Sequence, residues 1–273
     1  MSIRFKADPA FEKALKQMGL DSIDAVFAFS GGRNLVKATL AKHRRRIRFE
    51  IENPAATLFL KRYENTPVLA QIKNWLGHRR IASTMFYDLD PAQKLAAVGI
   101  HTPQTVCCGS ERGLLFENRS FIITRQIPGE SLERLLPPCF ADTSKENLKA
   151  RREFINSLAE FSRKFHTTGY RHRDFYLAHI FHHDGIFYLI DLQRAFKPLL
   201  FAERYRIKDI AQLSYSAPKK FFSRTDRLRF YLAYAATKRL GQNDKLFIRA
   251  VVKKMSQMAD HDRRHGRIIP FES

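Results

Sequence analysis

The chain has 273 residues, 44% of them hydrophobic, so it can bury a substantial core as one bilobal domain or as two small domains. This composition excludes a chain that is disordered throughout. Lysine and arginine number 48 against 27 aspartates and glutamates, and the resulting formal charge of +21 predicts an anionic partner. That partner could be a nucleic acid, an anionic lipid, or a phosphorylated or carboxylated substrate.

Cysteine usage and hydropathy indicate the compartment. The three cysteines, Cys107, Cys108 and Cys139, have no metal-ligand spacing, and their odd number favours a reducing environment over a disulfide framework. Residues 1–20 lack an uninterrupted apolar run of signal-peptide length. No segment approaches the roughly 20 apolar residues that cross a bilayer. We therefore expect a cytoplasmic protein.

The first third of the chain contains two short apolar, β-branched runs, residues 45–51 and 56–63. The segment between them includes Asn-Pro, a turn signal, so the two runs predict an antiparallel pair of strands. Lys61 stands near the end of the second run. Taken alone, a strand lysine is usually a solvated edge residue.

Residues 64–80 place apolar side chains at helical spacing beside Trp75, with His78, Arg79 and Arg80 at the end. This pattern predicts a helix. The helix could lie at an interface with another surface, or, as the simpler alternative, pack on its own domain.

The middle of the chain predicts a crossing between two lobes. Residues 88–100 read as a helix that ends near Gly99, and residues 120–136 as a buried strand, a Pro-Gly turn and a helix. We expect a strand-rich N-terminal lobe over residues 1–126 and a mainly helical C-terminal lobe over residues 127–273.

The second half of the chain begins with a strong helical pattern. Residues 152–170 place five large apolar side chains on one helical face, and Gly169 ends the pattern. From about residue 205 onward the pattern is again helical and strongly basic, with aromatic residues interleaved.

Two aspartates flank a predicted hairpin. Residues 177–183 and 186–190 read as strands joined by Asp184-Gly185. Asp174 precedes the hairpin in the sequence His-Arg-Asp, and Asp191 follows it directly. We expect both carboxylates to face one cleft. Singly, each aspartate could instead be a turn residue or a helix cap.

Phosphoryl transfer needs a residue that orients the acceptor, a carboxylate for the metal and a cation for the nucleotide phosphates. Asp174, Asp191 and Lys61 are suited to these three roles. A strand lysine, a lobe crossing, a core helix, His-Arg-Asp and a hairpin closing on an aspartate occur in the order of a protein kinase. The sequence therefore predicts an α+β, bilobal, protein-kinase-like fold.

Several motifs extend this likeness, namely RRRIRFEI, LFLKRY, VGIHTP, SFIIT, HTTG leading into HRDFYLAHIF, and IDLQRA. With them the chain resembles the lipopolysaccharide kinases that phosphorylate inner-core heptose or Kdo sugars, and most closely the heptose kinases. The resemblance runs from about residue 45 to residue 213. Its most specific feature is His179, five residues after Asp174, where protein kinases have a metal-binding asparagine.

The resemblance implies transfer of the ATP γ-phosphate to a sugar hydroxyl of the lipopolysaccharide core, with Mg²⁺, at the cytoplasmic face of the inner membrane. It implies that Asp174 orients or deprotonates the hydroxyl and that Asp191 binds Mg²⁺. His179 would assist at the metal or brace the loop. Asp209, in RIKDIAQL, would support the catalytic loop by hydrogen bonding.

For the nucleotide, the resemblance implies contacts by Lys61 and by Gln126 and Ile127 at the lobe crossing. A glutamate usually pairs with the lysine, but Asp88 stands at the matching position. Its shorter side chain, with Asp90 nearby, leaves open which acid forms the ion pair.

The chain has no Gly-x-Gly-x-x-Gly motif. Lys42, Arg44 and Arg45 could meet phosphates by charge instead. The slightly preferred alternative is a solvated basic turn.

The excess positive charge suits the anionic lipopolysaccharide core and a peripheral contact with the inner membrane, and we expect no nucleic acid partner because no nucleic-acid-binding motif is present. Two other functions stay open from the residues alone. One is a kinase-like phosphotransferase for a protein or metabolite, and the other is a basic binding protein that has lost catalysis.

Overall fold

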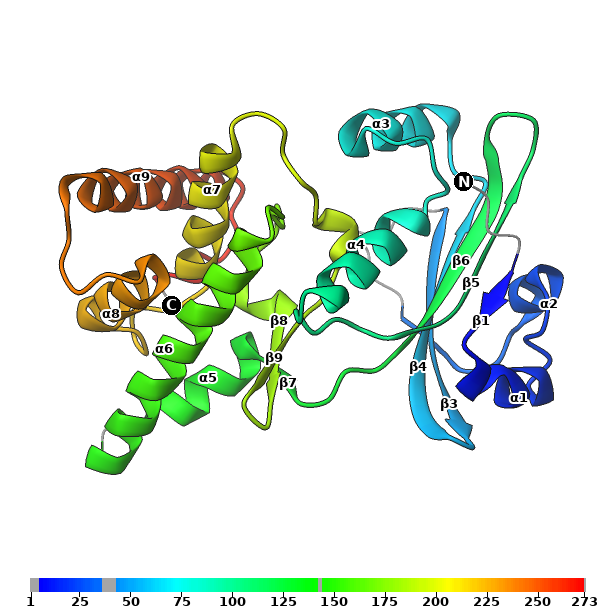
Figure 1. The fold of residues 1–273 in the computed structure, drawn as a ribbon, viewed down its shortest axis with the longest axis horizontal. Helices are drawn as coiled ribbons and strands as arrows, with labels where there is room; N and C mark the ends of the chain where they lie inside the picture. The colour runs from blue at the N-terminus through cyan, green and yellow to red at the C-terminus, as the bar shows by residue number, and fades with distance from the viewer. Residues whose placement is uncertain (1–4, 36–42, 142–143, 273) are drawn as a thin grey trace. The chain divides into compact units, whose positions relative to one another are not determined.

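The computed structural model describes residues 5–35, 43–141 and 144–272 (Figure 1). Residues 1–94 and 102–127 form one compact unit, and residues 95–101 and 128–273 form a second. The lobe ranges expected from the sequence, 1–126 and 127–273, place residues 95–101 in the first lobe. In the structure these residues, which include the end of a helix, group with the second unit. No helix within the described ranges is long and apolar enough to span a membrane.

The first unit is built on a six-stranded antiparallel sheet with the strand order β1-β5-β6-β4-β3-β2 (Figure 1). Its elements, with the helix that leads into the second unit, are β1 (Lys6–Ala7), α1 (Pro9–Gln17), α2 (Ile23–Ala28), β2 (Arg33–Asn34), β3 (Arg44–Glu52), β4 (Ala55–Glu64), α3 (Val68–His78), α4 (Phe86–Ala97), β5 (Thr105–Arg112) and β6 (Glu117–Arg125).

Each face of this sheet has its own core. Side chains of α1 and α2, such as Leu15 and Val26, pack with Leu60 and Phe121 on one face. Residues of α4 pack with Tyr63, Cys108 and Ile122 on the other face. The alternation of side chains along a strand therefore decides which face each residue of β4 serves.

The predicted strand pair is confirmed as β3 and β4, and the helix predicted over 64–80 is confirmed as α3. The sequence reading did not identify α1. Its start signal is present, because the Asp8 side chain accepts a hydrogen bond from the Ala10 N–H at 3.0 Å and Pro9 occupies the first turn.

The second unit is mainly helical, with a small antiparallel sheet in the order β7-β8-β9. Its elements are β7 (Glu130–Ser131), α5 (Leu132–Ala141), α6 (Lys145–Thr167), the 3₁₀ turn η1 (Leu177–His179), β8 (Ile180–His183), β9 (Ile186–Leu189), the 3₁₀ turn η2 (Leu192–Arg194), α7 (Ala202–Tyr215), α8 (Arg224–Ala235) and α9 (Gln242–Arg264). The predicted core helix and hairpin are confirmed as α6 and β8–β9, so the α+β class, strand-rich first and mainly helical second, is confirmed.

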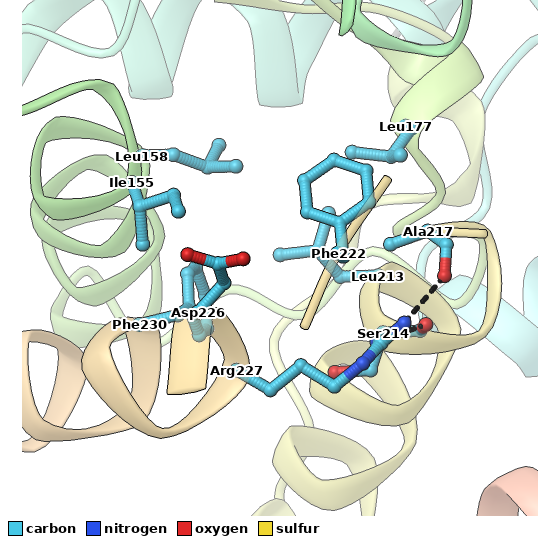
Figure 2. Close-up of a pocket in the computed structure, with 10 residues that line it drawn as sticks. All are labelled: Ile155, Leu158, Leu177, Leu213, Ser214, Ala217, Phe222, Asp226, Arg227 and Phe230. Atoms are coloured by element: carbon cyan, nitrogen blue, oxygen red, sulfur yellow. Dashed lines mark hydrogen bonds between the residues drawn. The ribbon is translucent and has the colours of Figure 1, made fainter. Parts of the chain in front are cut away.

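A small apolar pocket of about 40 Å³ lies among α6, α7 and α8 (Figure 2). Arg227 closes one side of it, donating hydrogen bonds to the carbonyl oxygens of Ser214 at 2.8 Å and Ala217 at 2.6 Å. Asp226, also in the lining, pairs with the buried Arg151 of α6. Because its polar groups are used in joining these helices, we assign this pocket to packing.

Candidate active site

Lys61 and Asp88 form an ion pair within the first unit. Lys61 lies on β4, between β3 and β6, so it is not an edge-strand residue. Its Nζ lies 3.1 Å from Asp88 Oδ1 and 3.2 Å from Oδ2, and Asp88 belongs to the first turn of α4. The Lys61 side chain keeps 21% of its surface exposed, whereas that of Asp88 keeps 7%. The Lys61 ammonium is thus held by the Asp88 carboxylate and is still partly exposed to solvent.

Tyr63 completes this arrangement. Its hydroxyl donates to Asp88 Oδ2 at 3.0 Å, and burial, together with the nearby Asp88 charge, raises the pKa of Tyr63 well above its usual value. The phenol therefore stays protonated and donates. Asp90 pairs instead with Arg80 at 3.2 Å and Lys94 at 2.8 Å, so the geometry identifies Asp88 as the partner of Lys61.

The register of β3 and β4 sorts the basic residues between the two faces of the sheet. Arg46 is directly opposite Lys61 and Arg44 is opposite Tyr63, so both arginines lie on the Lys61 face. Arg45 is opposite Arg62 on the other face. The hypothesis that Arg45 meets phosphates together with Lys61 conflicts with this register. Lys42 lies outside the described residues.

Gln126 and Ile127 follow β6 at the end of the first unit. The Gln126 backbone N–H donates to the carbonyl oxygen of Thr57 at 2.8 Å, which ties this segment to β4. Ile127 is buried and Gln126 is exposed. Their contact with a nucleotide stays a prediction.

In the second unit, Asp209 supports the loop that carries Asp174. Asp209 is fully buried on α7, and its Oδ2 accepts the backbone N–H of His172 at 2.8 Å. The same oxygen lies 3.2 Å from Nε2 of His166, whose Nδ1 contacts the Tyr234 hydroxyl at 2.8 Å. The supporting role predicted for Asp209 is confirmed by these hydrogen bonds.

One residue, Ile190, ties the Asp174 loop to the segment that ends in Asp191. The His172 Nε2 donates to the Ile190 carbonyl oxygen at 2.9 Å, and the Ile190 N–H donates to the His179 carbonyl oxygen at 3.0 Å. Because Asp191 directly follows Ile190, these two hydrogen bonds fix the backbone near Asp191 relative to the loop that carries Asp174. Burial lowers the pKa of His172, so its ring is a neutral donor.

The Asp174 carboxylate is held by an arginine that the sequence reading did not single out. Arg194 Nε lies 2.6 Å from Asp174 Oδ2, and Arg194 Nη2 lies 3.4 Å from Oδ1. The Asp174 side chain keeps 27% of its surface exposed, so solvent or a substrate hydroxyl can reach it. A signal was present, since Arg194 stands only three residues after Asp191 in the motif IDLQRA.

Asp191 begins η2 in a left-handed conformation with φ of 57°, yet its side chain makes no capping hydrogen bond. No residue among those described pairs with its carboxylate, so the helix-cap alternative does not account for this acid. His179 Nδ1 donates to the Asp174 carbonyl oxygen at 2.8 Å. This bond braces the loop that carries Asp174.

The carboxylate of Asp191 suits a magnesium ion. Mg²⁺ in kinases is bound by one or two carboxylates together with substrate phosphates and waters, and needs no enclosed cage of protein ligands. No three His, Cys, Asp or Glu side chains of the described segments gather into a metal-binding group. Binding of Mg²⁺ by Asp191, whose carboxylate has no partner among the described residues, and by His179 stays a prediction.

Lys208 is a further basic residue near this loop. It lies on α7 next to Asp209, and burial lowers its pKa while the charges of Asp174 and Asp209 act in the opposite direction. The charge of Asp174 therefore contributes to the pKa of Lys208.

Comparison with known proteins identifies the relatives of this chain. A family model described as "Lipopolysaccharide kinase (Kdo/WaaP) family" matches residues 38–234. The lipopolysaccharide core heptose(I) kinase WaaP of Escherichia coli strain K12 is 32% identical over 203 residues, which is 70% of this chain and 74% of that protein. The protein of the same name from Pseudomonas aeruginosa is 24% identical over 217 residues, 74% of each chain.

A solved structure shares the fold. The structure titled "WaaP in complex with acyl carrier protein" superposes with a TM-score of 0.68 at 22% sequence identity. The match covers 95% of this chain and 99% of that chain.

Proposed function

The chain belongs to the lipopolysaccharide kinase (Kdo/WaaP) family, and from that premise we propose that it phosphorylates a heptose, the first of the core, rather than Kdo. Family membership makes it a phosphotransferase that uses ATP and acts on a sugar of the lipopolysaccharide core. The heptose preference is supported by the names of its curated relatives, which are heptose(I) kinases.

The observation that carries the proposed mechanism is the tie between the two acids through Ile190. Asp174 is partly exposed and oriented by Arg194, while the Asp191 carboxylate is unpaired within the described residues. One acid is thus suited to accept a proton and the other to bind a cation.

In this mechanism Asp174 accepts a hydrogen bond from the sugar hydroxyl and takes its proton as the oxygen attacks the γ-phosphorus. The bond from the γ-phosphorus to the β,γ-bridging oxygen breaks, and ADP leaves. Lys61, held by Asp88, neutralises charge on the nucleotide phosphates. Asp191 and His179 would hold Mg²⁺, which when bound offsets negative charge on the phosphate oxygens. Gln126 and Ile127 would contact the nucleotide base.

The proposal includes a location. ATP is a cytoplasmic nucleotide and the acceptor sugar is carried on a lipid, so we propose a cytoplasmic enzyme that acts peripherally at the inner face of the inner membrane. The net charge of +21 supports attraction to the anionic acceptor and membrane.

A direct test supplies the purified protein with Mg-ATP and two truncated lipopolysaccharides, one ending in Kdo and one extended by a single heptose. We expect phosphate to enter only the heptose-bearing acceptor, at a position that mass spectrometry assigns to the heptose. Asp174→Ala should lose at least about a hundredfold in kcat, the usual size of a lost acid–base group.

Asp184→Asn is the matched control, because Asp184 lies in the same segment but at the exposed hairpin turn, with 84% of its side chain exposed. It should keep wild-type kcat. Full activity in Asp174→Ala would refute the role of Asp174, and phosphate on the acceptor that ends in Kdo would refute the heptose assignment.

A further inference from the structure

The first unit exposes large apolar side chains on α3, just after it, and at the turn between β5 and β6. The exposed fractions are 81% for Leu69, 74% for Leu76, 61% for Ile81, 102% for Leu114 and 65% for Leu115. We call these five residues the α3–hairpin surface. Single exposed apolar residues are ordinary, but a group of five large ones on and beside two joined elements is typical of an interaction site.

The two elements are held together by specific contacts. The rings of Trp75 and Phe116 stack at 5.3 Å and 2° between planes, and Phe116 directly follows Leu114 and Leu115. The buried Gln71 side chain donates to the Glu117 carbonyl oxygen at 3.0 Å and accepts the Glu117 N–H at 2.9 Å.

These contacts orient α3 in an unusual way. A surface helix normally buries its apolar face, but here a glutamine is buried while Leu69 and Leu76 are exposed. The two leucines are seven residues apart and so share one face of the helix. The hydrogen bonds of Gln71 with Glu117 thus fix α3 with Leu69 and Leu76 exposed to solvent.

Basic residues accompany the exposed leucines. Lys73 lies between Leu69 and Leu76 on the same helical face. Arg79 ends α3, and like Lys73 it has no acidic partner among the described residues. Arg112 lies at the hairpin, where its Nη2 donates to the Leu115 carbonyl oxygen at 2.8 Å. Leucines flanked by lysine and arginine match the chemistry of an anionic lipid surface, apolar inside and negatively charged at its headgroups.

We propose that the α3–hairpin surface inserts into an anionic phospholipid bilayer. Leu69, Leu76 and the two hairpin leucines enter the upper acyl region, and Lys73 and Arg79 meet the phosphates. The inference rests on the proposed function in one respect, that the acceptor sugar is carried on a membrane lipid. It adds which side chains make the membrane contact.

The chain offers a probe that needs no mutation. Trp75 is its single tryptophan, and its Nε1 donates to the Ala82 carbonyl oxygen at 3.1 Å, which fixes the ring on α3. Vesicles of phosphatidylglycerol and phosphatidylethanolamine with brominated acyl chains should quench Trp75 emission, whereas unbrominated vesicles should not. Emission that is equal in both vesicles would overturn the proposal.

A variant carrying Leu69→Ser, Leu76→Ser, Leu114→Ser and Leu115→Ser should bind anionic vesicles at least about tenfold more weakly, since four apolar side chains no longer leave water. The matched control carries Leu246→Ser and Val252→Ser on α9, which are 52% and 58% exposed. It should bind as the wild type does. Equal binding by the wild type and the four-leucine variant would refute the surface.

Two further measurements separate the alternatives. Light scattering tests whether the surface joins two copies of the chain. The proposal would be overturned if the wild type were a dimer, the four-leucine variant were a monomer, and both bound vesicles equally.

Phosphorylation of a deacylated, water-soluble core oligosaccharide should be equal in the wild type and this variant, while phosphorylation of vesicle-embedded lipopolysaccharide should fall at least about tenfold in the variant. Failure of the wild type on both acceptors, with vesicle binding as expected, would refute the proposed function and leave the membrane surface standing.

Discussion

Buried polar side chains hold the loop that carries Asp174. Asp209 accepts from the His172 backbone and contacts the His166 ring, and all three residues are buried. Burial lowers the pKa of His166 and of His172, so both rings stay neutral in the folded protein. The loop geometry therefore depends on two uncharged imidazoles.

This dependence predicts how stability changes with pH. In the unfolded chain both histidines take up protons as the pH falls below about 6.5, whereas in the folded chain their lowered pKa values delay protonation. Stability is thus fully present above that pH and falls below it, by up to about 1.4 kcal/mol per pH unit for each histidine. Urea unfolding between pH 8 and pH 5 measures this slope.

His166→Gln should show a shallower slope than the wild type, because one of the two groups no longer titrates. Glutamine can still donate to Asp209. Identical slopes in the two proteins would contradict the link between burial of His166 and acid sensitivity.

Arg194 gives a second prediction at the level of a single residue. Arg194→Ala should lower kcat by about tenfold or more, because the carboxylate of Asp174 loses the group that orients it. Arg194→Lys keeps the positive charge but not the contact through two nitrogens, so its kcat should lie between that of the wild type and that of Arg194→Ala. Steady-state kinetics at saturating acceptor measure the effect. An Arg194→Ala enzyme faster than the wild type would show that this ion pair restrains Asp174 rather than orienting it.

At the level of elements, the pairing of β3 with β4 decides which basic residues can act with Lys61. Arg46 and Lys61 are cross-strand neighbours, and Arg45 and Arg62 are neighbours on the opposite face. Arg62 donates to the Phe29 carbonyl oxygen and is buried, so that face serves the contact with α2. Period-two alternation is visible in the sequence, but it identifies Arg46 only once the register is known.

Arg46→Ala should therefore weaken ATP binding by about tenfold, the effect of one lost charge contact to a phosphate, while Arg45→Ala should change it little. The KM for ATP and a nucleotide-binding titration measure both variants. The two arginines are adjacent in the sequence and differ in the face they occupy, so each controls for the other. A stronger effect in Arg45→Ala would contradict the assignment of the two faces.

The whole molecule carries a positive field that its fold does not cancel. The charge of +21 is spread over both units, and many of the arginines are exposed. Such a field raises the rate at which an anionic acceptor meets the enzyme.

Raising NaCl from about 0.05 M to about 0.5 M shortens the screening length from roughly 14 Å to roughly 4 Å. We expect kcat/KM for the anionic acceptor to fall several-fold over this range, with kcat changing less, because steering acts on the encounter. Initial rates with a dephosphorylated, less anionic acceptor provide the comparison. An equal salt response for both acceptors would contradict electrostatic steering.

The sequence by itself determined several of the elements and their order, although not α1. The strand pair β3–β4, the core helix α6 and the hairpin β8–β9 follow from side-chain periodicity and turn residues, which act over a few neighbouring positions. The resemblance read from the motifs around Lys61, Asp174 and Asp191 is confirmed by the family comparison, although the roles of these residues stay predictions.

Only the tertiary structure decided which side chains pair with the candidate site residues. Lys61 meets Asp88 across 27 positions, Arg194 meets Asp174 across 20, and Asp209 reaches the His172 backbone across 37. Which side chains meet over such separations depends on strand register and on how helices pack against the sheet and one another, and no local pattern encodes that. The outward leucines of α3 have the same cause, because the same sequence periodicity would have allowed that face to be buried.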